Sequence, residues 1–253
     1  MVERLDLFKA RFADFADQYV LIGGAACTVA MQSVGIDFRA TKDLDIVLCV
    51  EVLDADFAKA FWQFVREGRY ENQEQAAGKR QLYRFTKPQT DGFPFMLELF
   101  SRTLDTLTPA EGSVLTPIPF GDEVSSLSAI LLDDDYYTFL MSGKQEIDGV
   151  QIVGAEHLIP LKARAWLDLT ERKTAGGDVD SRNIKKHKND VFRLFAIVDP
   201  EFAGLVPRRV QLDMAAFLEK MPTEALDLKA MGLAGQTLDS VTAEIRRIYG
   251  LGI

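Results

Sequence analysis

One stretch of the sequence constrains the fold more than any other: LIGGAACTVAMQSVGIDFRATKDLDIVLCV, from Leu21 to Val50. An apolar run ends at two glycines, a segment of small residues follows, and a second apolar run begins with Asp43 and Asp45. Short apolar runs bounded by turn residues predict buried strands, and the segment Ala25 to Val34 between them predicts a helix. The order of strand, turn, helix and strand indicates an α/β arrangement.

Composition narrows the class of protein. The chain has 253 residues, of which 47% are hydrophobic and 26% charged, as is typical of a soluble globular protein with one large domain or two modest ones. No apolar run approaches the roughly 20 residues that span a bilayer. The N-terminal sequence MVERLDLFKARFADF is charged and helix-periodic, unlike a secretory signal. We therefore expect a cytoplasmic protein that does not contact membranes.

The numbers of cysteines and histidines and the net charge argue against two further classes of protein, those with structural zinc and those that coat nucleic acid. Cys27 and Cys49 both lie in apolar segments, which predicts buried thiols. With only two cysteines, which are not clustered, and two histidines, the sequence does not supply the ligand pattern of a structural zinc site. A net charge of -9 argues against a surface that coats nucleic acid, although it allows a local basic patch.

The periodicity of the chain changes near residue 154. Before it, Asp54 is expected to cap a helix that Gly68 closes, and strands are expected at YVLIGG, DLDIVLCV, RQLYRFTK, FPFMLELFS, SAILLD, YYTFLMSG and GVQIVG. After it, four segments have helical spacing: Ala155 to Arg172, Asn183 to Val198, Gln211 to Met221 and Thr237 to Tyr249. We predict an α/β (α+β) domain over residues 1–153 and a helical domain over 154–253, with a cleft between them.

Asp43 and Asp45 are the first candidate site residues. Residues i and i+2 of a strand point to the same face, with Cα atoms roughly 7 Å apart. Two carboxylates held so close repel each other, and a divalent cation such as Mg²⁺, which prefers oxygen ligands, resolves the repulsion. The alternative is that both acids cap the solvated end of the strand, near Arg39 and Lys42.

The glycine pair suggests a second ligand. Gly23 and Gly24 end a strand and open a helix, where the backbone can approach a ligand closely and the helix N-terminus favours phosphate. By itself a glycine pair is also consistent with a plain tight turn. A turn and a strand cap together do not explain the full order of two glycines, Arg39 and Asp-x-Asp.

These residues resemble the DNA polymerase β-like nucleotidyltransferase superfamily, and within it the branch of the bacterial AbiEii abortive-infection toxins. The pattern of that branch is hhGG-x-A, a helix and then R-x-T-x-D-h-D-h, and this chain supplies it at Gly23, Gly24, Ala26, Arg39, Thr41, Asp43, Leu44, Asp45 and Ile46. The resemblance implies a nucleotidyltransferase-like mixed β-sheet with flanking helices. It also implies that Asp43 and Asp45 ligate Mg²⁺ and that the glycine turn, with Arg39 and Thr41, holds the triphosphate of an NTP.

The superfamily usually carries a third metal-binding acid on a later strand. Glu98 in FPFMLELFS is the best match, because it lies between Leu97 and Leu99 in an apolar strand. The alternative is that Glu98 lies on the solvated face of an alternating strand.

The resemblance extends into the helical half. LIPLKARAWLDLTERK followed by NIKKHKNDVFRL resembles the family's hLK-hhAh and K-D-hhDh motifs, with Lys162, Lys188 and Asp190 at the matching positions. It implies that Lys162 neutralises nucleotide phosphate, that Lys188 helps to bind the nucleotide, and that Asp190 orients a basic residue or the acceptor. Lys162 also lies in an apolar helical stripe, where the alternative is a side chain that extends to the surface. The run Lys185 to Lys188 is either a solvated basic face or a contact for RNA phosphates.

Together these features predict an Mg²⁺-dependent nucleotidyltransferase that moves an NMP from an NTP to an acceptor hydroxyl. The resemblance implies a tRNA or protein acceptor and a toxin neutralised by a cognate antitoxin protein. Two other readings stay open: a regulatory module that binds an NTP without turnover, and a small-molecule enzyme that modifies an antibiotic.

Overall fold

The computed structural model describes residues 4–39, 41–49, 51–75, 81–101, 116–117 and 133–252. These residues form two compact units. The first lies within residues 1–119 and 144–154, and the second lies within residues 120–143 and 155–253. Among the described helices, none combines the length and the apolar character that crossing a membrane requires.

The first unit is built on a mixed sheet to which the described residues contribute eight strands, in the order β6-β3-β4-β5-β2-β1-β8-β7. The two central pairings differ in direction: β2 runs parallel to β5 and antiparallel to β1. The strands are β1 (Tyr19–Ile22), β2 (Asp43–Leu48), β3 (Tyr70–Gln75), β4 (Gln81–Pro88), β5 (Met96–Ser101), β6 (Thr116–Pro117), β7 (Lys144–Ile147) and β8 (Val150–Val153).

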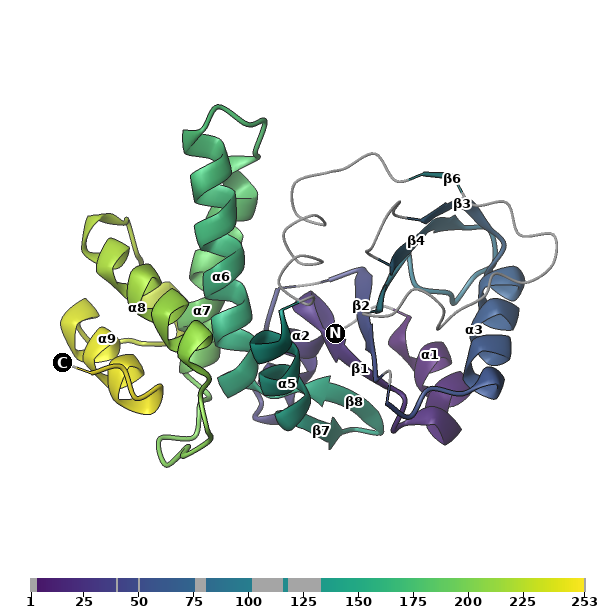
Figure 1. The fold of residues 1–253 in the computed structure, drawn as a ribbon, viewed down its shortest axis with the longest axis horizontal. Coiled ribbons are helices and arrows are strands. Elements are labelled where there is room, and N and C mark those ends of the chain that lie inside the picture. Colours follow the sequence, from purple (N-terminus) through teal and green to yellow (C-terminus); the bar gives the residue numbers. More distant parts are fainter. Residues whose placement is uncertain are drawn as a thin grey trace. The chain divides into compact units, whose positions relative to one another are not determined.

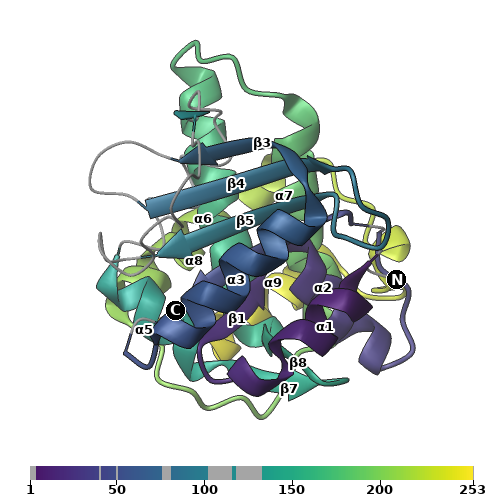
Figure 2. The same cartoon turned by 90° about the vertical axis from the view of Figure 1, so that its right-hand side faces the viewer.

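Helices cover both faces of this sheet. Helix α1 (Leu5–Phe12), with the 3₁₀ turn Ala13–Phe15, and helix α3 (Ala55–Gly68) lie on one face, and α2 (Gly23–Ser33) lies on the other (Figures 1 and 2). Asp54 begins α3 as predicted, because its side chain accepts a hydrogen bond of 2.8 Å from the Phe57 amide.

Aromatic rings fill the space between the sheet and the helices α1 and α3. Phe12 is fully buried, and its ring contacts Phe8 and Tyr19 as well as Phe57, Phe61 and Phe64 of α3. Phe61 in turn contacts Phe85 on β4. This cluster fixes α3 against one face of the sheet, so that the polar residues of the central strands are directed to the other face.

The second unit is helical. It contains α5 (Asp134–Ser142), α6 (Ala155–Thr174), α7 (Ser181–Phe195), α8 (Arg208–Lys220) and α9 (Leu238–Ile248), with 3₁₀ turns at Met221–Thr223 and Lys229–Met231. Helices α6 and α7 pair along their length, and α8 packs beside α6 (Figure 1). Side chains of Asp133, Asp180 and Thr237 cap α5, α7 and α9.

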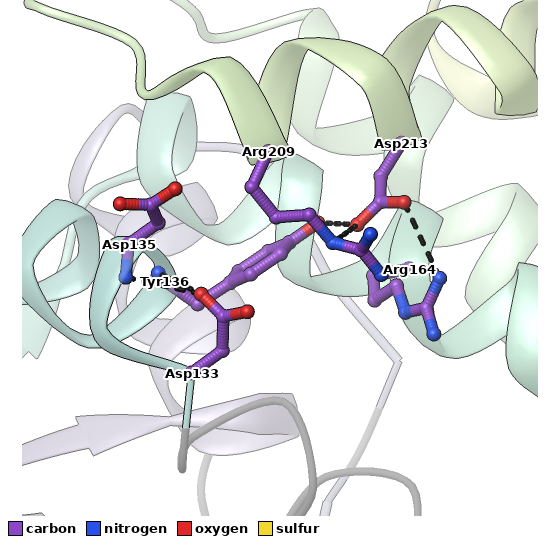
Figure 3. A network of polar contacts seen from close by, with 6 residues as sticks. All are labelled: Asp133, Asp135, Tyr136, Arg164, Arg209 and Asp213. Carbon is purple, nitrogen blue, oxygen red and sulfur yellow. Dashed lines mark hydrogen bonds and ion pairs between the residues drawn. The ribbon is translucent and has the colours of Figure 1, made fainter.

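A buried carboxylate on α8 joins three helices of this unit. Asp213 accepts a hydrogen bond of 2.9 Å from the Tyr136 hydroxyl and lies 3.3 Å from Arg164 and 3.5 Å from Arg209 (Figure 3). Burial, and then the charge of Asp213, raise the pKa of Tyr136 well above its usual value, so the hydroxyl stays a donor. This network links α5 to α6 and α8.

The predicted mixed α/β fold class and the four C-terminal helices are confirmed, and the side chains of Cys27 and Cys49 are buried as predicted. The prediction of a strand at YYTFLMSG was wrong, because this segment forms α5, which the preceding Asp133 caps. The polar strands β3 and β7 were not predicted, and the strand expected at SAILLD lies outside the described residues.

The sequence predicts a domain boundary between residues 153 and 154. In the structure the first unit ends at Gly154 and the helical unit resumes at Ala155. The described residues 133–143 belong with the helical unit and not with the α/β domain in which they were expected.

Phe12→Ala tests the aromatic cluster. Loss of a fully buried ring should reduce the free energy of unfolding by about 3–5 kcal/mol, because a cavity replaces its contacts. Urea denaturation measures this loss. Phe15→Ala, at a partly exposed neighbouring ring, is the matched control and should cost clearly less; equal losses would contradict the role given to Phe12.

Candidate functional site

The register of the central strands places the predicted acids on one face of the sheet. Asp45 on β2 pairs with Glu98 on β5, and Glu98 pairs with Arg84 on β4. Phe85, the neighbour of Arg84, points toward α3, so Arg84 and its cross-strand partners point to the opposite face. Asp43 is two residues from Asp45 and shares that face. The shared face of Asp43 and Asp45 is as predicted, and both are partly exposed.

The carboxylate of Asp45 lies directly against the first glycine of α2. Gly23 has a φ of +65°, and a Cβ built on it would lie 1.7 Å from Oδ2 of Asp45. Glycine is therefore required at this position for two reasons: the left-handed backbone and the close approach of an acid. The candidate metal-binding acid and the predicted phosphate turn are neighbours in space.

The second glycine is in contact with the segment that leads into β2. A Cβ on Gly24 would lie 2.8 Å from Oγ1 of Thr41 and 3.5 Å from a terminal nitrogen of Arg39. The buried Thr28 Oγ1 donates to the carbonyl of Gly24 at 2.9 Å and lies 3.5 Å from that of Arg39. Gly23, Gly24, Arg39, Thr41 and Asp45 are thus brought together. The backbone amides of Gly23 and Gly24 begin helix α2, which has no acid in its first turn.

Lys42, which the strand-cap alternative places beside the acids, has its Nζ 4.9 Å from the centre of the Phe95 ring, next to the residue that pairs with Asp43.

Glu98 is buried, with 6% of its surface exposed, and Arg84 contacts its carboxylate. Nε and a terminal nitrogen of Arg84 both lie 2.7 Å from Oε1 of Glu98. Burial, followed by the charge of Asp45, raises the pKa of Glu98 to about 8, while Arg84 acts in the opposite direction. The alternative of a solvated Glu98 is excluded by this burial.

The donor chemistry of the site suits Mg²⁺. Protein sites bind this ion through one or two carboxylates and leave other positions to water and substrate phosphates, and Asp43 and Asp45 match that pattern. In the part of the chain that the structure describes, no group of three or more His, Cys, Asp or Glu side chains is arranged to hold a metal ion. The predicted set of Asp43, Asp45 and Glu98 is therefore not preassembled as three ligands.

Within the helical unit, Lys162 and Asp190 form a buried pair. They are 4% and 0% exposed, their charged atoms are 3.9 Å apart, and Arg193 lies 3.5 Å from the other oxygen of Asp190. Lys162 does not extend to the surface, and Asp190 holds two basic side chains. Their roles toward a nucleotide and an acceptor remain predictions of the resemblance.

Lys188 lies apart from that pair. Its buried Nζ contacts Oε2 of Glu224 at 2.6 Å and donates to the carbonyl of Ala225 at 3.0 Å. Lys185 is exposed and Lys186 is partly exposed. The ammonium of Lys188 is thus engaged by its own unit, and the solvated part of the basic run is Lys185 and Lys186.

Sequence reasoning missed Arg84, Thr28 and Glu224. For Arg84 a signal existed: it interrupts the apolar residues Tyr83 and Phe85, as Glu98 interrupts Leu97 and Leu99. Two opposite charges that interrupt successive apolar strands indicate a cross-strand pair. Thr28 and Glu224 carry no comparable signal.

No model of a known protein family matches the chain, and no curated protein is significantly similar to it in sequence. Among solved structures, the chain is similar to an antigenic nucleotidyltransferase-like protein from Paracoccidioides brasiliensis, with a TM-score of 0.45. The match has 15% sequence identity and covers 98% of this chain and 97% of that chain. A likeness at this level assigns neither a fold nor an activity to this protein.

Gly23→Ala tests the contact between Asp45 and the glycine turn. Gly35→Ala is a matched control, because Gly35 has a φ of +76° but nothing within 4 Å of an added Cβ. The control should cost about 1–2 kcal/mol for the left-handed backbone. Gly23→Ala should cost about 2 kcal/mol more because the methyl overlaps Asp45. Urea denaturation of both variants measures the difference, and equal losses would contradict the close approach.

The raised pKa of Glu98 predicts a pH dependence of stability in the metal-free protein. Between the unfolded pKa near 4.5 and the folded pKa of about 8, the folded state binds more protons, so the free energy of unfolding falls as pH rises through this window. The loss should be on the order of a few kcal/mol and level off above it.

Urea denaturation from pH 5 to 9 of the protein and of Glu98→Gln isolates this effect, because the amide oxygen still accepts from Arg84 and does not titrate. Parallel pH profiles for the two proteins would contradict the assignment.

Proposed function

We propose that this protein is a nucleotidyltransferase, an enzyme that transfers an NMP from an NTP to an acceptor hydroxyl. The observation that carries the proposal is the position of Asp45, whose carboxylate lies against Gly23 at the start of α2 and beside Glu98 on β5. A cation-binding acid and a phosphate-binding helix start within one contact distance are what a metal-nucleotide substrate requires.

The start of α2 would bind the triphosphate. Its first-turn amides have no intrahelical partner, its axis places partial positive charge there, and neither glycine carries a side chain that blocks approach. The guanidinium of Arg39 lies close to Gly24 and would add charge-assisted bonds to phosphate oxygens. Thr28 holds the carbonyls of Gly24 and Arg39, which keeps these two groups together before the nucleotide binds.

Asp43 and Asp45 would hold Mg²⁺, which neutralises phosphate charge and orients the α-phosphate when bound. In the transfer, the acceptor oxygen forms a bond to the α-phosphorus as the bond to the bridging oxygen of pyrophosphate breaks. Glu98 would take the proton of the hydroxyl once a cation held by Asp43 and Asp45 lowers the raised pKa of this neighbouring carboxyl group. Positioning and charge supply most of the rate in such reactions.

The acceptor is proposed from the resemblance to AbiEii-like toxins, which implies tRNA or a protein hydroxyl and a cognate antitoxin as partner. The exposed Lys185 and the neighbouring Lys186 are the described residues of the basic run best placed to meet RNA phosphates.

Asp45→Asn should abolish transfer while leaving the melting temperature nearly unchanged, because the amide keeps the shape but not the charge of a partly exposed side chain. The assay incubates the protein with Mg²⁺, each α-labelled NTP and either total cellular RNA or total protein, and follows label and pyrophosphate. Asp91→Asn, at an exposed turn before β5, is the control and should retain full activity.

Each outcome of this assay has a distinct meaning. Label in tRNA or in polypeptide, lost in Asp45→Asn, supports the proposal and identifies the acceptor. Full activity of Asp45→Asn would reject it. Binding of NTP and Mg²⁺ by calorimetry, without pyrophosphate release on any acceptor, would favour a regulatory module that does not turn the nucleotide over.

A further inference from the structure

Glu98 has a cationic partner in the protein itself. Both Nε and a terminal nitrogen of Arg84 contact the same carboxylate oxygen at 2.7 Å, and the Arg84 and Glu98 side chains are 19% and 8% exposed. Two charge-assisted contacts at this depth are much stronger than a surface ion pair. A metal ion that took Glu98 as a ligand would have to approach the positive guanidinium at short range.

The strand register makes this arrangement persistent. Arg84 and Glu98 are directly paired residues of the antiparallel strands β4 and β5, and the flanking pairs place Phe85 opposite Leu97 and Tyr83 opposite Leu99 in the core. Moving Arg84 off Glu98 would take the cationic partner away from a buried acid, which is strongly unfavourable. The pairing of β4 with β5 therefore fixes Arg84 beside Glu98, and Arg84 is part of the site.

The grouping of acids leads to the same conclusion. In the part of the chain that the structure describes, no group of three or more His, Cys, Asp or Glu side chains is arranged to hold a metal ion. Glu98 is therefore not assembled with Asp43 and Asp45 into a three-carboxylate metal site.

We infer that Arg84 takes the place of a second metal ion at Glu98, so that the protein binds one divalent cation, through Asp43 and Asp45, and Glu98 is not a metal ligand. This inference rests on the proposed function and revises the ligand set that the sequence predicts. Arg84 is then a positioning residue that fixes Glu98 and supplies the positive charge there.

Titration of the chelator-treated protein with Mn²⁺, followed by calorimetry and by the electron paramagnetic resonance of free Mn²⁺, tests the inference without any activity measurement. The protein should bind one Mn²⁺, and Asp45→Asn should lose affinity by about ten-fold or more. Glu98→Gln should still bind one Mn²⁺ and should lose less affinity than Asp45→Asn, because Glu98 contacts a ligand but is not one itself.

Arg84→Met should bind Mn²⁺ more tightly or bind a second ion, because Glu98 then lacks its cation. If this variant fails to fold by circular dichroism, the double variant R84M/E98Q replaces it, since removal of both charges leaves no buried ion unpaired. The double variant should again bind one Mn²⁺ with near-parental affinity.

Two bound Mn²⁺ in the parent protein, a loss of affinity in Glu98→Gln as large as that in Asp45→Asn, or unchanged binding in a folded Arg84→Met would overturn the inference. The proposed function fails separately: Mn²⁺ binding that Asp43→Asn and Asp45→Asn both leave intact would remove its metal site. Loss of binding in Asp45→Asn and in Glu98→Gln alike would reject only the role of Arg84.

Discussion

The candidate site depends on one close contact, that between the Asp45 carboxylate and the α-carbon of Gly23. Side chains larger than hydrogen are excluded there by the 1.7 Å that separates an added Cβ from Oδ2, and the positive φ excludes them a second time. This contact sets how near an acid of β2 comes to the start of α2. The phosphate-binding and cation-binding properties of the site are therefore two aspects of one local geometry.

The pairing register of the sheet strands positions the other charged residues of the site, Glu98 and Arg84, beside Asp45. Because β2 and β5 are parallel and β4 and β5 antiparallel, Asp45, Glu98 and Arg84 follow one another across three strands on a single face. The opposite face is packed with aromatic rings against α3. The same alternation that gives the unit its core thus gathers its charges, and no long loop is needed to assemble them.

The sequence predicted the elements with strong local signals. Helix α3 has an apolar stripe and an Asp54 cap, and α2 follows a glycine pair at the end of an apolar strand, so both were found. Helix α5 was mistaken for a strand because its residues Tyr136, Tyr137 and Phe139 favour strands, and the local N-cap signal of Asp133 was overlooked. The packing of α5 against α8 is a tertiary contact that the local sequence does not show. Arg84 leaves a local signal, because it interrupts an apolar strand, but strand pairing decides that Glu98 is its partner, and pairing cannot be read from a single strand.

The order of elements along the chain has a consequence for synthesis of the protein. Strand β1, near the N-terminus, pairs with β8, which ends at Val153, and α6 begins at Ala155. The sheet that carries the acids therefore lacks its last two strands until more than half of the polypeptide has left the ribosome, and a fragment that stops before β7 would expose an edge of β1 to aggregation.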